Sequence, residues 1–141
     1  HENVVGANQV CTWQFGVPLR TALAGGVPVH DPYRFAWTRY VETADFVLWI
    51  SAFRSEVPAI PAGKTVIALA PPGTVFGQEP AVFIPVGTPG IDHAAHVFRG
   101  DTVVALRTGA LIDRGLPDVA TVLNAIANAI AGALPQEAPA C

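Results

Sequence analysis

The sequence predicts an α/β domain with a mostly parallel sheet, and three short apolar runs are the main reason. They cover residues 45–51, 64–70 and 81–86, and each is continuous and of strand length, as in strands buried on both faces. Segments with helical periodicity stand before and after these runs, at residues 31–44 and 117–134. A helix that leads directly into buried strands favours a parallel arrangement.

The N-terminal third is predicted to hold two helices joined by a loop. Residues 4–15 are compatible with a short helix, whereas glycines and prolines interrupt residues 16–30 and predict mostly loop. Asp31 and Pro32 then supply an N-cap and a first helical residue. The apolar stripe that follows predicts an amphipathic helix of about three turns over residues 31–44: Tyr33, Ala36, Trp37, Tyr40, Val41 and Ala44.

The C-terminal third is predicted to add a hairpin and a second helix. Residues 102–106 resemble a fourth strand, which can pair with residues 96–99 across Gly100 and Asp101. Residues 117–134 carry one apolar face with helical spacing, and Pro135 ends the helix. Residues 1–134 are therefore expected to form a single domain, and residues 135–141 a disordered tail.

Composition excludes several function classes. The net charge is −3 with one lysine and no basic block, which argues against nucleic-acid binding. No apolar run reaches roughly 18 residues, so no membrane span is expected. Cys11 and Cys141 lie at opposite ends, as in neither a disulfide framework nor a metal cluster, and this favours a reduced, cytoplasmic setting.

A low charge content fits either an Ala/Val/Pro-rich globular domain or a piece whose faces are covered by other protein, and the second is favoured here. Only 13% of the residues are charged, against about 25% in typical domains. The chain also contains no methionine, which indicates a processed chain or a fragment of something longer. An isolated piece of this kind is expected to expose apolar surface and can form a homodimer.

The loop at residues 86–101 contains the candidate metal ligands Asp92, His93 and His96. Two histidines three residues apart can hold one cation on a helix, with the aspartate as a third ligand. The surrounding glycines and proline argue against a helix here, and on a strand residues 93 and 96 point to opposite faces. A hydrogen-bonded loop histidine and a strand histidine are therefore the favoured interpretation.

For the other candidate polar residues, too, a structural role is weighed against a functional one. Cys11 has no base or ligand partner placed near it, so a small buried thiol is favoured over a nucleophile. The amides of Asn8 and Gln9 suit recognition of a heterocycle or a backbone, but helix capping is favoured. Ser51 follows the first strand, where α/β folds place ligand loops, yet no glycine-rich phosphate turn follows it.

Three segments carry a family resemblance. Residues 6–14 (GANQVCTWQ), 44–50 (ADFVLWI) and 83–92 (FIPVGTPGID) resemble, in this order and spacing, the B-type subunit of formylmethanofuran dehydrogenase. More closely, they resemble the beta subunit of the bacterial formyltransferase/hydrolase complex. The resemblance extends over residues 3–126.

The resemblance implies the C-terminal part of a subunit more than twice as long as this chain. That family is similar to molybdopterin and tungstopterin oxidoreductases, which implies a Rossmann-like three-layer domain with a mostly parallel sheet. If a pterin is bound, the matching strand-end positions are Ser51, Pro71, Gly87 and Thr88. The metal ligand and the catalytic histidine and arginine of those enzymes lie upstream of this chain.

Departures from the dehydrogenases favour the bacterial complex. Residues 92–99 replace a small acidic stretch, and residues 51–54 lack the Ser-Asp-Pro type of turn found in pterin binders. The resemblance then implies a cofactor-free scaffold, with catalysis in the other subunits. That complex moves a formyl group from tetrahydromethanopterin to a methanofuran-like carrier and hydrolyses it to formate, within the one-carbon metabolism of methylotrophs.

Two alternatives remain open. The first is the pterin-binding C-terminal domain of a tungsten or molybdenum formylmethanofuran dehydrogenase. The second is a small metallohydrolase that uses Asp92, His93 and His96.

Overall fold

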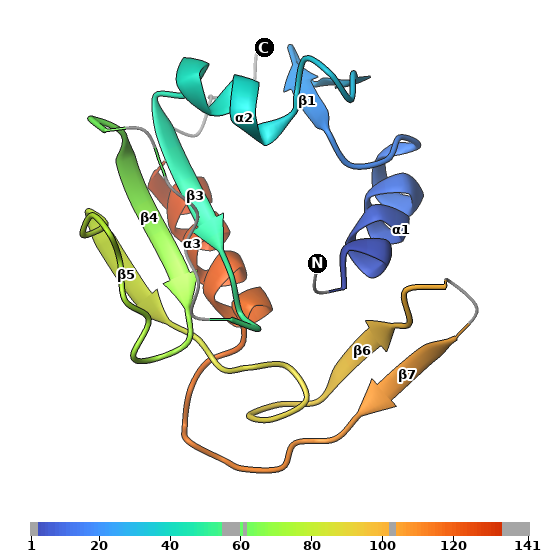
Figure 1. Ribbon diagram of the computed structural model, residues 1–141, viewed down its shortest axis with the longest axis vertical. Helices are drawn as coiled ribbons and strands as arrows, with labels where there is room; N and C mark the ends of the chain where they lie inside the picture. The colour runs from blue at the N-terminus through green and yellow to red at the C-terminus, as the bar shows by residue number, and fades with distance from the viewer. Residues whose placement is uncertain (1–2, 55–59, 61, 102–103, 134–141) are drawn as a thin grey trace, which may run out of the picture.

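A computed structural model describes residues 3–54, 60, 62–101 and 104–133. A three-stranded parallel sheet and the long helix α3 (Val119–Ala133) form one body, with helix α1 (Val4–Phe15) and two antiparallel hairpins beside it (Figure 1). The predicted α/β class and parallel sheet are confirmed. Within the described residues no helix is long and apolar enough to cross a membrane.

The parallel sheet has the order β3–β4–β5, with β3 Phe46–Ile50, β4 Thr65–Ala70 and β5 Val82–Pro85. All three strands lie inside the apolar runs predicted as buried strands. Central β4 is the most buried, because Ala68, Leu69 and Ala70 are fully covered. Burial on both faces explains why this strand has no alternating polar residues.

Helix α3 covers the β4–β5 half of one sheet face. Val122 packs with Ala52, Leu69 and Val86 in the core, and Leu123 and Ile126 extend this contact. Asp118 caps the helix, since its Oδ1 accepts a hydrogen bond from the Thr121 N–H at 2.6 Å, which holds the pKa of the carboxyl below its ordinary value. The predicted helix at residues 117–134 is thus confirmed for the described part.

The opposite face is covered by aromatic side chains on short elements. Trp37 of α2 (Trp37–Tyr40) contacts Trp49 of β3 with ring centroids 5.7 Å apart. Phe76, in the connection between β4 and β5, meets Phe83 edge-on at 5.2 Å. That connection contains no helix, in agreement with its short length.

The prediction of mostly loop for residues 16–30 is wrong for residues 21–30. Strands β1 (Thr21–Ala24) and β2 (Val27–His30) pair antiparallel around Gly25 and Gly26. Both glycines have positive φ, +58° and +81°, as a two-residue hairpin turn of type I′ requires. A Gly-Gly pair between apolar residues was the available signal for this hairpin.

The predicted three-turn helix over residues 31–44 is also wrong. Asp31 does cap a turn, since its Oδ1 accepts hydrogen bonds from the N–H groups of Tyr33 and Arg34. Ala36 is extended, at φ −63° and ψ 135°, and this ends the turn. Only the four-residue α2 and a 3₁₀ turn, Val41–Thr43, follow. The contact of Trp37 with Trp49 shows that tertiary packing outweighs the helical periodicity here.

The hairpin predicted from residues 96–99 and 102–106 is confirmed with a shift in register. Strand β6 (Ala95–Phe98) pairs antiparallel with β7 (Ala105–Thr108), so the second strand starts later than residue 102. Residues 102 and 103 lie outside the described part, as does the expected tail at residues 135–141. The predicted helix at residues 4–15 is present as α1.

Candidate functional site

The four positions expected to match a pterin-binding edge do lie at one edge of the sheet. Ser51 follows β3, Pro71 follows β4, and Gly87 and Thr88 come shortly after β5. Because the strands are parallel, their carboxyl ends meet at this edge. The Ser51 N–H donates to the Leu69 carbonyl at 2.9 Å, and its hydroxyl donates to the Arg54 carbonyl at 3.0 Å.

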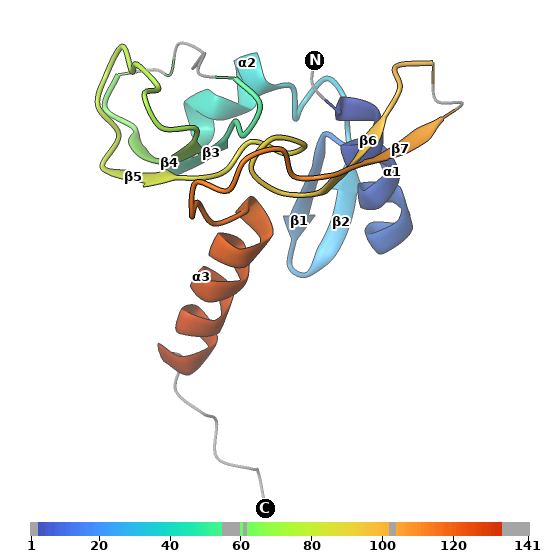
Figure 2. The same ribbon diagram turned by 90° about the horizontal axis from the view of Figure 1, so that it is seen from below.

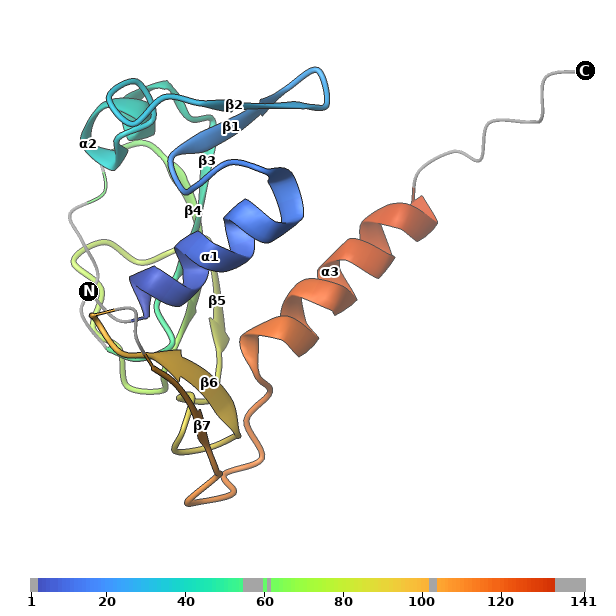
Figure 3. The same cartoon turned by 90° about the vertical axis from the view of Figure 1, so that its right-hand side faces the viewer.

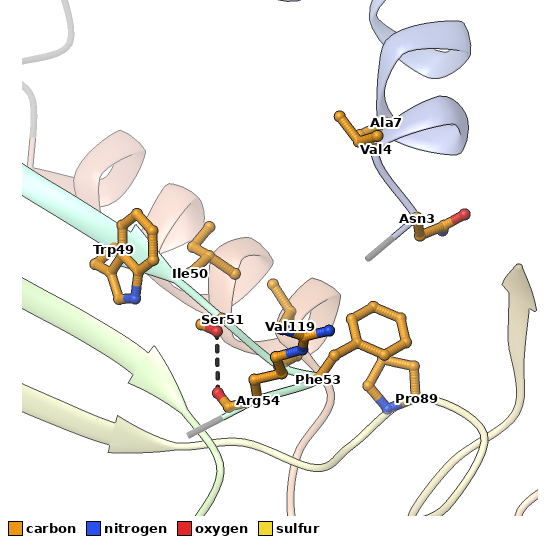
Figure 4. A pocket seen from close by; sticks show the side chains of 11 residues that line it. Asn3, Val4, Ala7, Trp49, Ile50, Ser51, Phe53, Arg54, Pro89 and Val119 are labelled. Carbon is orange, nitrogen blue, oxygen red and sulfur yellow. Dashed lines mark hydrogen bonds between the residues drawn. The ribbon is translucent and has the colours of Figure 1, made fainter. Parts of the chain in front are cut away.

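An open cavity of about 830 Å³ lies beside the end of β3 (Figure 4). One wall comes from α1 and the residue before it, and the other from residues 49–54, with Pro89 and Val119 at one end. Ser51 lines this cavity, but Pro71, Gly87 and Thr88 do not. The lining is more apolar than polar, which suits contact with protein as well as with a small molecule.

The loop after β5 is closed by interactions of its own. The buried carboxylate of Asp92 accepts two hydrogen bonds from Arg114, at 2.5 and 2.6 Å, and one from the Thr88 N–H at 2.7 Å. The bidentate Arg114 guanidinium, with the Thr88 N–H, lowers the pKa of Asp92 from 3.8 to about 2. Asp92 thus ties the loop to the segment that leads into α3.

Gly87 and Gly90 allow this loop to pack so tightly. A Cβ at Gly87 would lie 2.9 Å from the Asp92 Cβ, and Gly90 has φ +78° with Thr108 close by. Side chains at these positions would clash or strain the backbone. The glycines in this loop are therefore explained by its own packing.

The two histidines occupy separate environments. His93 places Nδ1 3.0 Å from the Ala94 carbonyl and Nε2 3.3 Å from the Gly87 carbonyl. His96 lies in β6 and is exposed. Among the described residues no group of three or more His, Cys, Asp or Glu side chains could hold a metal ion. Asp92 thus pairs with Arg114, and the candidate ligands Asp92, His93 and His96 do not form a metal-binding group.

Asn3 and Gly6 make a contact that the sequence reasoning missed. The Asn3 amide donates to the His96 carbonyl at 3.2 Å and accepts from the Phe98 N–H at 2.9 Å, so it pairs with β6 like a short piece of strand. A Cβ at Gly6 would lie 2.6 Å from the Phe98 ring. These contacts dock α1 on the second hairpin. They join residues more than 90 positions apart, and no local pattern signals them.

The other candidate residues serve local structure. The Asn8 side chain accepts a hydrogen bond from the Leu19 N–H at 2.9 Å, so this amide recognises backbone of its own chain. Cys11 is half-buried rather than fully buried. The indole N–H of Trp49 is buried and has no acceptor within the described residues.

The structure is similar to a chain of one solved complex. This is the formyltransferase/hydrolase complex (FhcABCD) from Methylorubrum extorquens, whose crystal structure was determined in complex with methylofuran. The TM-score is 0.80 and the sequence identity 25%, over 92% of this chain and 38% of that chain. This chain therefore spans less than half the length of the chain it matches.

Comparison with sequences adds no further assignment. No family model matches this chain, and no curated protein matches it either. The resemblance seen in the sequence is thus confirmed at the level of the complex, on structural grounds.

Proposed function

We propose that this chain is the non-catalytic, structural C-terminal part of the beta subunit of a formyltransferase/hydrolase complex. The complex would act in tetrahydromethanopterin-linked oxidation of formaldehyde to formate, in the cytoplasm. The structural match over 92% of the chain carries this proposal. In this assignment the other subunits perform the transfer and the hydrolysis.

The loop after β5 supports a structural role. Its most polar residue, Asp92, already accepts three hydrogen bonds from Arg114 and Thr88. The Gly87 carbonyl contacts His93, and the Gly87 N–H donates to the Pro117 carbonyl at 2.9 Å. Groups engaged in this way hold the chain together and are not offered to a substrate.

A pterin-binding domain of a tungsten or molybdenum dehydrogenase is the second candidate. The shared edge of Ser51, Pro71, Gly87 and Thr88, beside a cavity of about 830 Å³, favours it. The residues fit such a group poorly. The Thr88 N–H donates to Asp92, and three of the four positions do not line the cavity. No step of a reaction is therefore assigned to a pterin.

The deciding experiment is to purify the full-length complex from its native source, identify its chains and measure its metals. We expect formyltransferase-like and amidohydrolase-like chains to co-purify, with no tungsten or molybdenum. Tungsten or molybdenum together with iron would establish the dehydrogenase instead. A stable, monodisperse full-length monomer without partners would contradict the proposal.

The metallohydrolase candidate has its own test. We expect a protein in which His93 and His96 are both replaced by alanine to retain the zinc content of the unchanged protein, because Asp92 is bound to Arg114. Zinc content is measured by mass spectrometry after dialysis. Loss of one equivalent of zinc from the double variant would revive this candidate.

A further inference from the structure

Strand β3 has a free edge in the part of the chain that the structure describes. The sheet order β3–β4–β5 leaves β3 outermost, and it pairs only with β4. The Ser51 N–H bonds to β4. By the alternation of a parallel ladder, the N–H groups of Val47 and Trp49 also point to β4, and those of Phe46, Leu48 and Ile50 point away.

The sequence of this edge lacks the charged residues and proline that often protect an edge strand from pairing. Its sequence, FVLWI, contains no charged residue and no proline. Phe46, Leu48 and Ile50 are 58%, 41% and 41% exposed. Edge strands that stay unpaired usually carry lysine, proline or a bulge, so an apolar edge of this kind is suited to pairing.

Neighbouring cavities that share lining residues form a hollow between this edge and α1. One cavity lies between Val4 of α1 and Ile50 of β3, and a second, of about 430 Å³, lies between Arg20 and Leu48. A third, of about 510 Å³, shares Val4 with the first and Arg20 with the second. Figures 2 and 3 show α3 and the β1–β2 hairpin extending to the same side of the sheet.

We infer that the free edge of β3 is paired in the mature protein by an apolar β-strand from another part of the same subunit. The strand would be about as long as the five residues of β3 and would lie between β3 and α1. Its backbone would satisfy the outward N–H and C=O groups of Phe46, Leu48 and Ile50. The parallel sheet would then continue beyond this chain.

The length of the matched chain argues for this occupant. The alignment covers only 38% of that chain, so its larger part has no counterpart here and could supply the strand. The hollow is lined mainly by aliphatic and aromatic residues, as obligate protein interfaces are. The inference does not depend on which reaction the complex performs, because it rests on the sheet edge and on this length.

Site-resolved hydrogen exchange of the full-length subunit, purified alone and in its complex, tests the inference. We expect the amides of Leu48 and Ile50 to exchange at least about 100-fold more slowly than unprotected amides in both preparations. The amide of Trp49, which faces β4, is the internal reference for a paired strand. A Leu48→Lys variant should speed exchange at Ile50 about 10-fold or more, because a strand cannot pair closely beside a buried lysine.

The control variant is Val75→Lys, at a residue that is 83% exposed in the β4–β5 connection and should leave exchange at Ile50 unchanged. Fast exchange of Leu48 and Ile50 in both preparations would overturn the inference. So would protection that arises only with other subunits bound, or that rises with protein concentration, since these assign the edge to a partner or to a second copy. A full-length subunit no longer than this chain would overturn it as well.

Discussion

Asp92 shows how one carboxylate organises the loop after β5. Two histidines stand close to it in the sequence, which made it a candidate metal ligand. In the structure its partner is Arg114, which is 22 residues away in the sequence and has a half-exposed side chain. Both oxygens of Asp92 are engaged, so the residue joins the loop to the segment before α3. The carboxylate therefore has a structural role in this loop.

Replacing Asp92 by asparagine should destabilise the protein in a pH-dependent way. The pKa of Asp92 is about 2 in the folded protein, against an ordinary value of 3.8. Between these values the unfolded chain binds more protons than the folded chain, so the stability from this carboxylate is lost as pH falls. The urea midpoint of the variant should be lower at neutral pH, and the difference should shrink between about pH 5 and pH 2.

The control for this prediction is Asp101→Asn. Asp101 pairs with Arg99 at 2.6 Å, but both side chains are about half exposed, so solvent screens their interaction. We expect little change in the urea midpoint for this variant. A pH-independent difference between Asp92→Asn and the unchanged protein would show that the carboxylate charge has no role.

Helix α1 is held in place by contact rather than by its own sequence. It has no side-chain N-cap, and Val4, Val10, Trp13 and Phe15 are all largely exposed. Its anchors are Asn3, which pairs with the edge of β6, and Gly6, which lies against the Phe98 ring. Short helices of marginal propensity depend on such tertiary contacts.

Two helical glycines should respond to alanine in opposite ways. Gly6→Ala would place a Cβ 2.6 Å from the Phe98 ring and 2.7 Å from the Asn3 side chain, so it should destabilise the protein by about 1–3 kcal/mol. Gly132→Ala in α3 meets nothing within 4 Å. It should be neutral or stabilising by up to about 1 kcal/mol, because alanine favours helix.

Urea unfolding of both variants checks this prediction. Equal effects of the two substitutions would show that α1 does not pack on β6 through Gly6. In a Phe98→Ala background, Gly6→Ala should cost less stability than it does in the unchanged protein, because the clash with the Phe98 ring is then absent.

At the scale of the whole molecule, many large apolar side chains are exposed among the described residues. Exposed aromatic and aliphatic side chains occur on α1, the β1–β2 hairpin, β3 and the segment before α3, including Trp13 at 69% and Leu111 at 78%. Only 13% of the residues are charged. Both observations indicate faces that are covered by other protein.

The isolated 141-residue chain should therefore self-associate. We expect sedimentation velocity to show a weight-average mass that rises with concentration, with dimers or larger species present at tens of micromolar, about the range of weak apolar contacts. Leu48→Lys should weaken this association more than Val75→Lys, since Leu48 lies on the free edge of β3. A monomer at all concentrations would contradict the prediction.

Local patterns in the sequence were sufficient for the parallel strands and α3. Residues 4–15 were compatible with a helix, and contacts with β6 hold that helix, α1, in place. Continuous apolar runs specify buried strands, and the helical spacing of the apolar face specifies α3, because these signals act within one segment. The resemblance to pterin-binding enzymes singled out Ser51, Pro71, Gly87 and Thr88, and the predicted strand ends put these positions at one sheet edge.

Contacts between distant segments determined the rest. The helix expected at residues 31–44 is reduced to α2 and a 3₁₀ turn, where Trp37 packs on Trp49, and Asp92 pairs with Arg114. Asn3 paired with β6 across more than 90 residues, and β3 came to lie at the outside of the sheet. A residue's partner in such contacts depends on how the elements pack in three dimensions. Patterns within single segments of the sequence do not specify that packing.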